Sequence, residues 1–551
     1  MAVGDGLGAE IALNRALAAG EPREAIAAYY GQAELQQGEL AEARKWLGDG
    51  EFDEGSVGHG YHMLARLEMA QDNLPAAGRA FDRALQVKGR DPEIWVDIGR
   101  MRYRGGEQAE AIEASERALG LGPDNAAALQ FRGQLIRDSE GNLAALPFFE
   151  RALETNPDDV GLLGDYAATL GELGEANEML AAARRMIELD PANRRALYLQ
   201  AVLAARGGQF SLSRQLLGRS GYVDGEVPGA MQLSAVLDLE SGNFASAAQM
   251  LERLSVMQPD NRHVQDLLPR ALALGRNDRE LIYRFGEAAK RSSASPYLRS
   301  LVARSYERLG EYERAAAFTD AVSKPRASNP IAKEASVTLD VARVHGDETG
   351  PDVLQLVRAA LSARQNAEAR ESASRFLAKF PGSADALSLA GDTRLGTSDA
   401  DKALDLYRRA AHIRRPWPLT LRMAAASQAK GDQAASLRLL LAHFFGDPGN
   451  AEAARLLATN AAQSGDWPAA AIFADRAIKA GAINDPFLMM IQAEFALQEN
   501  DPKMAVEAAR EAYALLPANP LTTRMLAHVY RETGADPRLA EALVRKAARL
   551  V

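Results

Sequence analysis

A 34-residue period runs through almost the whole chain and constrains its fold more than any other feature. One clear copy starts at Pro92 and reads PEIWVDIGRMRYRGGEQAEAIEASERALGLGPDN. Its small residues and its proline recur one period later, since Gly99, Ala111, Ala118 and Pro123 are followed by Gly133, Ala145, Ala152 and Pro157. One such unit cannot bury its apolar faces alone, so the units must stack against one another.

The positions of the small residues have a physical cause. Gly or Ala at position 8 and Ala at position 20 let two helices of one unit cross closely, as in Gly99 with Ala111 and Gly391 with Ala403. This spacing resembles the tetratricopeptide repeat (TPR) family, whose unit is a pair of antiparallel helices, A and B. The resemblance implies an all-α fold, a right-handed solenoid of about fifteen repeats with a half repeat at the N-terminus.

The register divides the chain into segments. Residues 1–23 read as a partial repeat, residues 24–329 as an array of nine repeats and residues 350–551 as a second array of six. Between them, residues 330–349 break the register. Ala332, Ser336, Leu339 and Val344 favour one extra helix there, although Val337, Leu339 and Val341 alternate as a strand would.

The N-terminus has no basic region and no long apolar region, so it is not a signal peptide. In the repeat register, Ala9, Leu13 and Ala16 belong to a helix B whose helix A is absent. We therefore expect a longer precursor, from which a leader or membrane anchor has been removed. A native start with an atypical capping helix is the alternative.

Composition excludes several classes of function. A net charge of −10 over 551 residues argues against a protein that binds nucleic acid over its whole surface. The absence of cysteine excludes thiol catalysis. The sequence contains no run of 18 apolar residues, so no membrane span is predicted. No catalytic constellation, cofactor motif or metal site is predicted. His59 and His62 are spaced for a shared metal, but they lack a third ligand.

The resemblance also implies a binding surface, because in this family helix A residues at positions 2, 5, 9, 12 and 13 line the concave groove. Positively charged and hydrogen-bonding residues recur at these positions: Gln32, His62, Arg66, Arg100, Tyr103, Arg104, Gln130, Gln134 and Arg137, and in a second set Arg270, Arg304, Arg308 and Arg358. Arginine matches carboxylates in a bidentate manner, so such a row suits a repeating acidic ligand.

Two interpretations of this row stay open. In the first, it binds an acidic peptide or an anionic polysaccharide. In the second, the arginines only pair with nearby acids such as Asp97, Asp138 and Glu93. The carboxylate clamp of chaperone co-factors needs Lys at position 5 and Asn at position 9, and no unit here has both. The turn sequence RRPWP at 414–418 is interpreted as structural.

The opening segment, AEIALNRALAAGEPREAIAAYYGQAELQQGELAEARKWL, resembles the TPR arrays of envelope proteins encoded with bacterial exopolysaccharide and protein-sorting systems. The leading hypothesis is a non-enzymatic scaffold in the periplasm or anchored to the envelope. It would bind a partner protein or an anionic polysaccharide. The alternatives are a cytoplasmic adaptor that docks partner proteins and a regulatory module of a multi-component enzyme.

The register makes a prediction about packing. Ala111→Leu and Ala145→Leu should each overfill a crossing between helices A and B, lowering the free energy of unfolding by about 1–3 kcal/mol. Thermal or denaturant unfolding of the two variants measures the loss. Unchanged stability in both would mean that the register is misassigned.

Overall fold

The structure is a computed structural model that describes residues 6–258, 261–291, 294–322, 337–347, 349–482, 485–517 and 519–550. These residues form 32 α-helices and no strand. The predicted all-α solenoid is confirmed. A 34-residue step from residue 24 in the first array and from residue 350 in the second gives the start of each unit, and every helix A begins within one residue of that start, from α2 at Arg23 to α31 at Pro520.

The helices that precede the break in register are α1 Gly6–Ala18, α2 Arg23–Gln37, α3 Leu40–Leu47, α4 Val57–Ala70, α5 Leu74–Lys88, α6 Pro92–Arg104, α7 Gln108–Leu121, α8 Ala126–Ser139, α9 Asn142–Thr155, α10 Val160–Leu173, α11 Ala176–Leu189, α12 Arg194–Arg206, α13 Phe210–Ser220, α14 Pro228–Glu240, α15 Phe244–Met257, α16 Arg262–Leu274, α17 Asp278–Lys290, α18 Pro296–Arg308 and α19 Tyr312–Val322. The later helices are α20 Leu339–His345, α21 Gly350–Ser362, α22 Asn366–Lys379, α23 Ala384–Leu395, α24 Ala400–Ile413, α25 Trp417–Ala429, α26 Gln433–Gly446, α27 Ala451–Gln463, α28 Trp467–Lys479, α29 Pro486–Gln498, α30 Pro502–Leu515, α31 Pro520–Thr533 and α32 Pro537–Arg549.

Local sequence fixes the helix ends. The residue before many helices A is Asn, Asp, Ser or Thr, whose side chain accepts a hydrogen bond from a free backbone N–H of the first turn. Asn125, for example, accepts from the backbone N–H of Ala128 at 2.9 Å. At the other end of α10, Gly174 takes a left-handed conformation with φ of 86°, which favours glycine and turns the chain toward α11.

At three glycines in position 8, an aromatic ring occupies the space beside the backbone. A Cβ atom on Gly133 would lie 2.7 Å from the ring of Phe149, which is fully buried. Gly99 meets Phe131 and Gly391 meets Tyr407 in the same way. The unit at 160 has Met179 at position 20, where most other units have Ala, and its flexible side chain fills the crossing against Gly171.

The break in register holds the short helix α20, which packs against α21. The extra helix predicted for 330–349 falls partly outside the described residues, which resume at residue 337. The division of the chain into two arrays at this segment stays a prediction, and the two groups of repeats are called the first and the second array below. Pro269 lies inside α16, which continues to Leu274.

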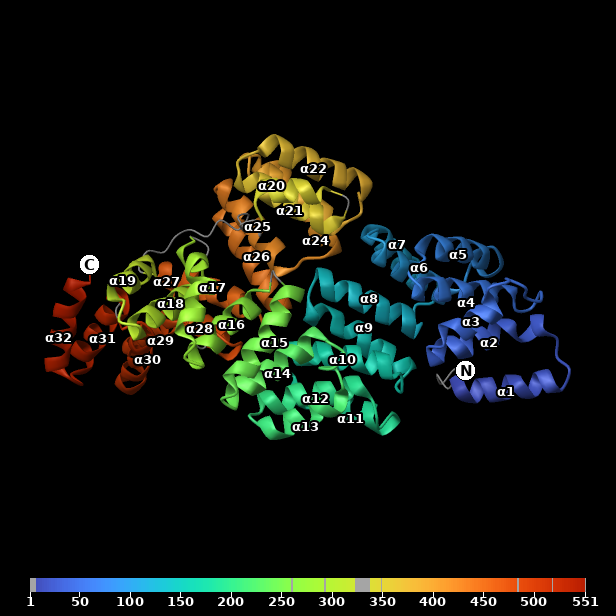
Figure 1. Ribbon diagram of the computed structural model, residues 1–551, viewed down its shortest axis with the longest axis horizontal. Helices are drawn as coiled ribbons and strands as arrows, with labels where there is room; N and C mark the ends of the chain where they lie inside the picture. Colours follow the sequence, from blue (N-terminus) through green and yellow to red (C-terminus); the bar gives the residue numbers. More distant parts are fainter. Residues whose placement is uncertain are drawn as a thin grey trace.

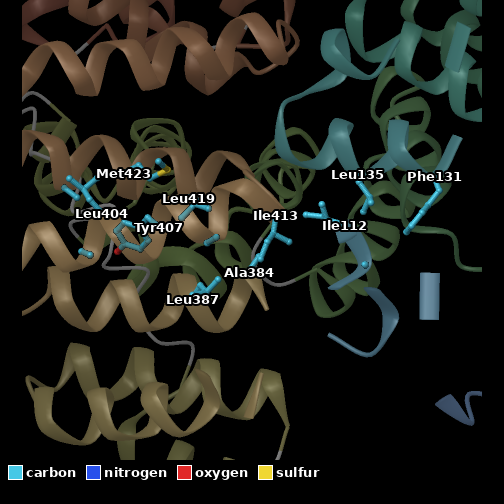
Figure 2. Close-up of a cluster of buried hydrophobic side chains, with 14 of the residues drawn as sticks. Ile112, Phe131, Leu135, Ala384, Leu387, Leu404, Tyr407, Ile413, Leu419 and Met423 are labelled. Atoms are coloured by element: carbon cyan, nitrogen blue, oxygen red, sulfur yellow. The ribbon is translucent and has the colours of Figure 1, made fainter. Parts of the chain in front are cut away.

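The second array does not extend away from the first but lies alongside it (Figure 1). Helices α24 and α26 contact α7, α8 and α9, although about 270 to 290 residues separate the contacting helices along the chain. One buried cluster spans this boundary. It joins Ile112 and Leu135 of the first array to Ile413, Leu419 and Met423 of the second. Figure 2 shows the side chains of Ile112 and Ile413 directed toward each other.

Backbone groups also join the two arrays. The N–H of Ala109 donates to the carbonyl oxygen of Gly382 at 3.2 Å, and the N–H of Arg415 donates to that of Asp138 at 2.8 Å. Near these bonds, Gly141 and Gly446 approach so closely that a Cβ on Gly446 would lie 2.6 Å from the carbonyl oxygen of Glu140. A side chain on Gly446 therefore requires the backbones to move apart.

We predict that Gly446→Ala loosens the contact between the arrays, at a cost of about 1–3 kcal/mol from overpacking. Small-angle scattering should show a larger radius of gyration, while circular dichroism should show unchanged helix content. Gly120→Ala is the matched control, because a Cβ on Gly120 meets nothing within 4 Å. An equal expansion in both variants, or in neither, would contradict this account of the contact.

Candidate functional site

The sequence-predicted site residues of the first array meet on the helix A side, where α2, α4, α6 and α8 pack side by side. Their centre is the buried carboxylate of Asp97 on α6. His62 Nε2 lies 2.8 Å from Asp97 Oδ2, Arg100 Nη1 lies 3.1 Å from Oδ1, and Arg66 Nε lies 3.6 Å from Oδ2. We call His62, Arg66, Asp97 and Arg100 the Asp97 cluster.

The Asp97 cluster carries a net positive charge, because two arginines share one carboxylate. Burial alone would raise the pKa of Asp97. The hydrogen bond with His62 and the charges of Arg66 and Arg100 outweigh burial and hold this pKa below its usual range. The side chains of Arg66 and Arg100 keep exposed fractions of 48% and 36%. The buried acid therefore fixes two guanidinium groups in place while leaving them accessible to an anion.

Next to the cluster, Arg104 extends the positive surface. Its guanidinium lies 3.0 Å from the exposed carboxylate of Asp72 and donates to the carbonyl oxygen of Met69 at 2.8 Å. Tyr103 donates to Asp138 at 2.7 Å. Burial and this hydrogen bond raise the pKa of Tyr103, so the phenol stays protonated and serves as a donor at neutral pH.

A second buried acid organises the glutamines of the row. Gln130 and Gln134 on α8 donate to Asp165 Oδ2 at 2.8 and 2.7 Å, and Arg195 donates to Oδ1 at 2.8 Å. Burial would raise the pKa of Asp165, but the hydrogen bond and charge of Arg195 lower it overall. Both glutamine side chains are therefore engaged with this acid.

The other predicted residues lie apart from the Asp97 cluster. Gln32 Oε1 lies 2.9 Å from His59 Nε2, and Arg137 is half-buried on α8. The pKa of His59 falls to about 4, first because of burial and then because of the charge of Lys88, so its ring is neutral at pH 7.

The second set occupies other elements. Arg270 is half-buried on α16. Burial raises the pKa of the neighbouring Tyr297, and the charge of Arg270 opposes this rise only in part. Arg308 Nε donates to Asp278 at 2.9 Å. Burial raises the pKa of the Asp392 carboxyl, and the positive charge of Arg358 on α21 is one of the contributions that oppose this rise. Within the described residues, no hydrogen bond or ion pair joins this set to the Asp97 cluster.

Arg304 has a role that the sequence did not indicate. Its Nη2 donates at 2.6 Å to the carbonyl oxygens of Ala514 and Leu515, at the C-terminus of α30. These carbonyls end a helix and carry partial negative charge, so a guanidinium is well placed there. Arg304 thus joins the first array to the second.

Sequence reasoning did not predict the surface on which the two arrays contact each other. Arg414 and Arg415 of the RRPWP turn lie there. Arg414 pairs with Asp385 at 2.6 Å, and the backbone N–H of Arg415 binds the first array at Asp138. The only signal was the combination of two arginines with Trp417 at a turn between repeats.

Comparisons with known proteins identify the repeats. Residues 62–126 and 354–418 match the model of the tetratricopeptide repeat family. These two segments therefore resemble tetratricopeptide repeats, and the described residues form a helical solenoid of that type. Among the helices of the described residues, none is long and apolar enough to cross a bilayer.

Individual relatives are similar over part of their length. Cellulose synthase 2 operon protein C of Komagataeibacter xylinus is 26% identical over 302 residues, which is 54% of this chain and 21% of that protein. Protein CTR9 homolog of Arabidopsis thaliana is 23% identical over 175 residues, 30% of this chain and 16% of that protein. The chain thus matches only about a fifth or less of either relative.

Among solved structures, PilW, a widely conserved type IV pilus biogenesis factor, is 18% identical, with a TM-score of 0.32. The match covers 38% of this chain and 98% of that one.

The Asp97 cluster predicts a pH-dependent contribution to stability. The pKa of Asp97 is lower in the folded state than in the unfolded state, where it is about 4. Ionised Asp97 therefore stabilises the fold fully above about pH 4, and this contribution is lost as the pH falls through the pKa of the folded state. Asp97→Asn should lower the free energy of unfolding at pH 7 by about 1–3 kcal/mol. Denaturant unfolding at several pH values should show this difference shrinking below about pH 4. A difference independent of pH would contradict the assignment.

Proposed function

We propose that this chain is a non-catalytic scaffold of the bacterial envelope, which holds an extended acidic segment of a partner protein on the helix A side of its first array. One observation carries the proposal: Arg66 and Arg100 are both held by one buried carboxylate and both remain partly exposed. Their shared partner leaves one positive charge uncompensated, and Arg104 lies on the same surface.

Preorganisation is the physical reason why this surface suits an anion. A flexible arginine loses side-chain entropy when it binds, whereas Arg66 and Arg100 are already oriented by Asp97. Arginine forks also accept carboxylates in bidentate geometry. An extended chain with regularly spaced acidic side chains could therefore meet the guanidinium groups of successive repeats.

The envelope assignment draws on the relative in a cellulose synthase operon, whose similarity covers 54% of this chain. The same relative favours a second candidate ligand, a polysaccharide that carries uronic acids. Its carboxylates present the same chemistry to Arg66 and Arg100, so the two ligands must be separated by experiment.

The experiment compares two triple variants with equal changes in charge. The groove variant carries Arg66→Gln, Arg100→Gln and Arg104→Gln. The control carries Arg151→Gln, Arg185→Gln and Arg253→Gln, three half-exposed arginines of helices B that each pair with an acid 27 residues earlier. Both proteins are titrated with a ten-residue oligoglutamate and with an oligoglucuronate of similar length.

We expect the groove variant to bind oligoglutamate about ten-fold more weakly than the control, because charge-assisted hydrogen bonds are lost. The affinity of the unaltered protein for oligoglutamate should also fall as the salt concentration rises. A preference for oligoglucuronate would favour the polysaccharide candidate. Equal affinity in the two triple variants would rule out this surface as the anion site.

A further inference from the structure

A pocket of about 300 Å³ lies at the boundary between the two arrays, away from the Asp97 cluster. Its walls come from α7 and α8 on one side and from α24 and α25 on the other. Such a volume is at the lower end of those that hold small ligands. The pocket is thus formed only when the second array is docked on the first.

The pocket has an apolar floor. Ile112, Leu135, Ile136 and Met423 line it, and each is at least 93% buried in the folded chain. Figure 2 shows Ile112 and Leu135 on one side of the boundary, and Met423 on the other. This floor favours a ligand with a short apolar body, because burying that body removes apolar surface from water.

Positive charge gathers on the polar walls. Arg132, Arg408 and Arg415 all line the pocket, together with His412, and Glu140 is the one carboxylate among the lining residues. Arg132 pairs with Glu116 at 3.4 Å and donates to the hydroxyl of Ser115 at 3.4 Å. Three arginines against one lining carboxylate leave an excess of positive charge, which favours an anion.

The backbone of Arg415 holds this residue at the pocket. Its N–H donates to the carbonyl oxygen of Asp138 of the first array at 2.8 Å, so the side chain starts from a defined position.

We infer that this pocket binds a small organic anion, in which a carboxylate or phosphate group is attached to a short apolar body. The anionic group accepts hydrogen bonds from Arg415 and Arg408, and the apolar body rests on Ile112, Leu135 and Met423. Because both arrays supply these residues, the bound anion also strengthens their docking.

Titration calorimetry on the full chain with four probes tests the inference. The probes differ in whether they contain the six-carbon apolar chain, the anionic group or both. Hexanoate and hexyl phosphate carry both parts, hexanol has only the body, and inorganic phosphate has only the head group. We expect hexanoate, hexyl phosphate or both to bind with a stoichiometry of one. Their affinity should exceed that of hexanol and of inorganic phosphate by at least about ten-fold. Whichever binds more tightly identifies the head group. Failure of both, or equal binding of hexanol, would overturn the inference.

Three single variants locate the binding. Arg415→Gln and Arg408→Gln should each weaken it about ten-fold, whereas Arg409→Gln, an exposed neighbour on α24 outside the pocket, should leave it unchanged. Arg408 is exposed, so its replacement tests the site even if the Arg415 variant folds poorly. Ala411→Leu, which fills the pocket, should abolish binding. Equal affinity in the Arg408 and Arg409 variants would refute the assignment.

Discussion

The structure depends on close crossing of the two helices in each repeat. Where a glycine stands at position 8, a large side chain lies against its backbone, as Phe149 does at Gly133, Tyr407 at Gly391 and Leu47 at Gly31. This neighbour fills the space that a side chain at position 8 would need, so the pair packs densely with few voids. Because the crossing has nearly the same geometry in each unit, every unit presents equivalent faces to the next.

Regular stacking also explains why polar contacts recur at constant separations. His62 with Asp97, Tyr103 with Asp138 and Gln130 with Asp165 are each 35 residues apart, one period plus one residue. On the helix B side, Arg151 with Asp124 and Arg185 with Asp158 are each 27 apart. The buried acids thus join neighbouring units, and the same joining orients the arginines proposed to bind an anion.

The sequence predicted the repeat boundaries well because small residues at positions 8 and 20 report local packing directly. It could not decide between the two interpretations of the arginine row, because Asp97 serves both: it neutralises part of the charge and it positions what remains. The docking of the second array was beyond the sequence. Ile112 and Ile413 stand in ordinary apolar stripes, and nothing in such a stripe names a partner about 300 residues away.

That distant partner matters while the chain is being made. A solenoid can fold unit by unit as it leaves the ribosome, since each unit needs only its neighbours. Ile112 and Leu135 are an exception, because part of their cover comes from Ile413 and Met423. Until those residues emerge, the first array carries an apolar surface open to other molecules. The order of synthesis therefore leaves a period in which this surface is vulnerable to aggregation or available to a chaperone.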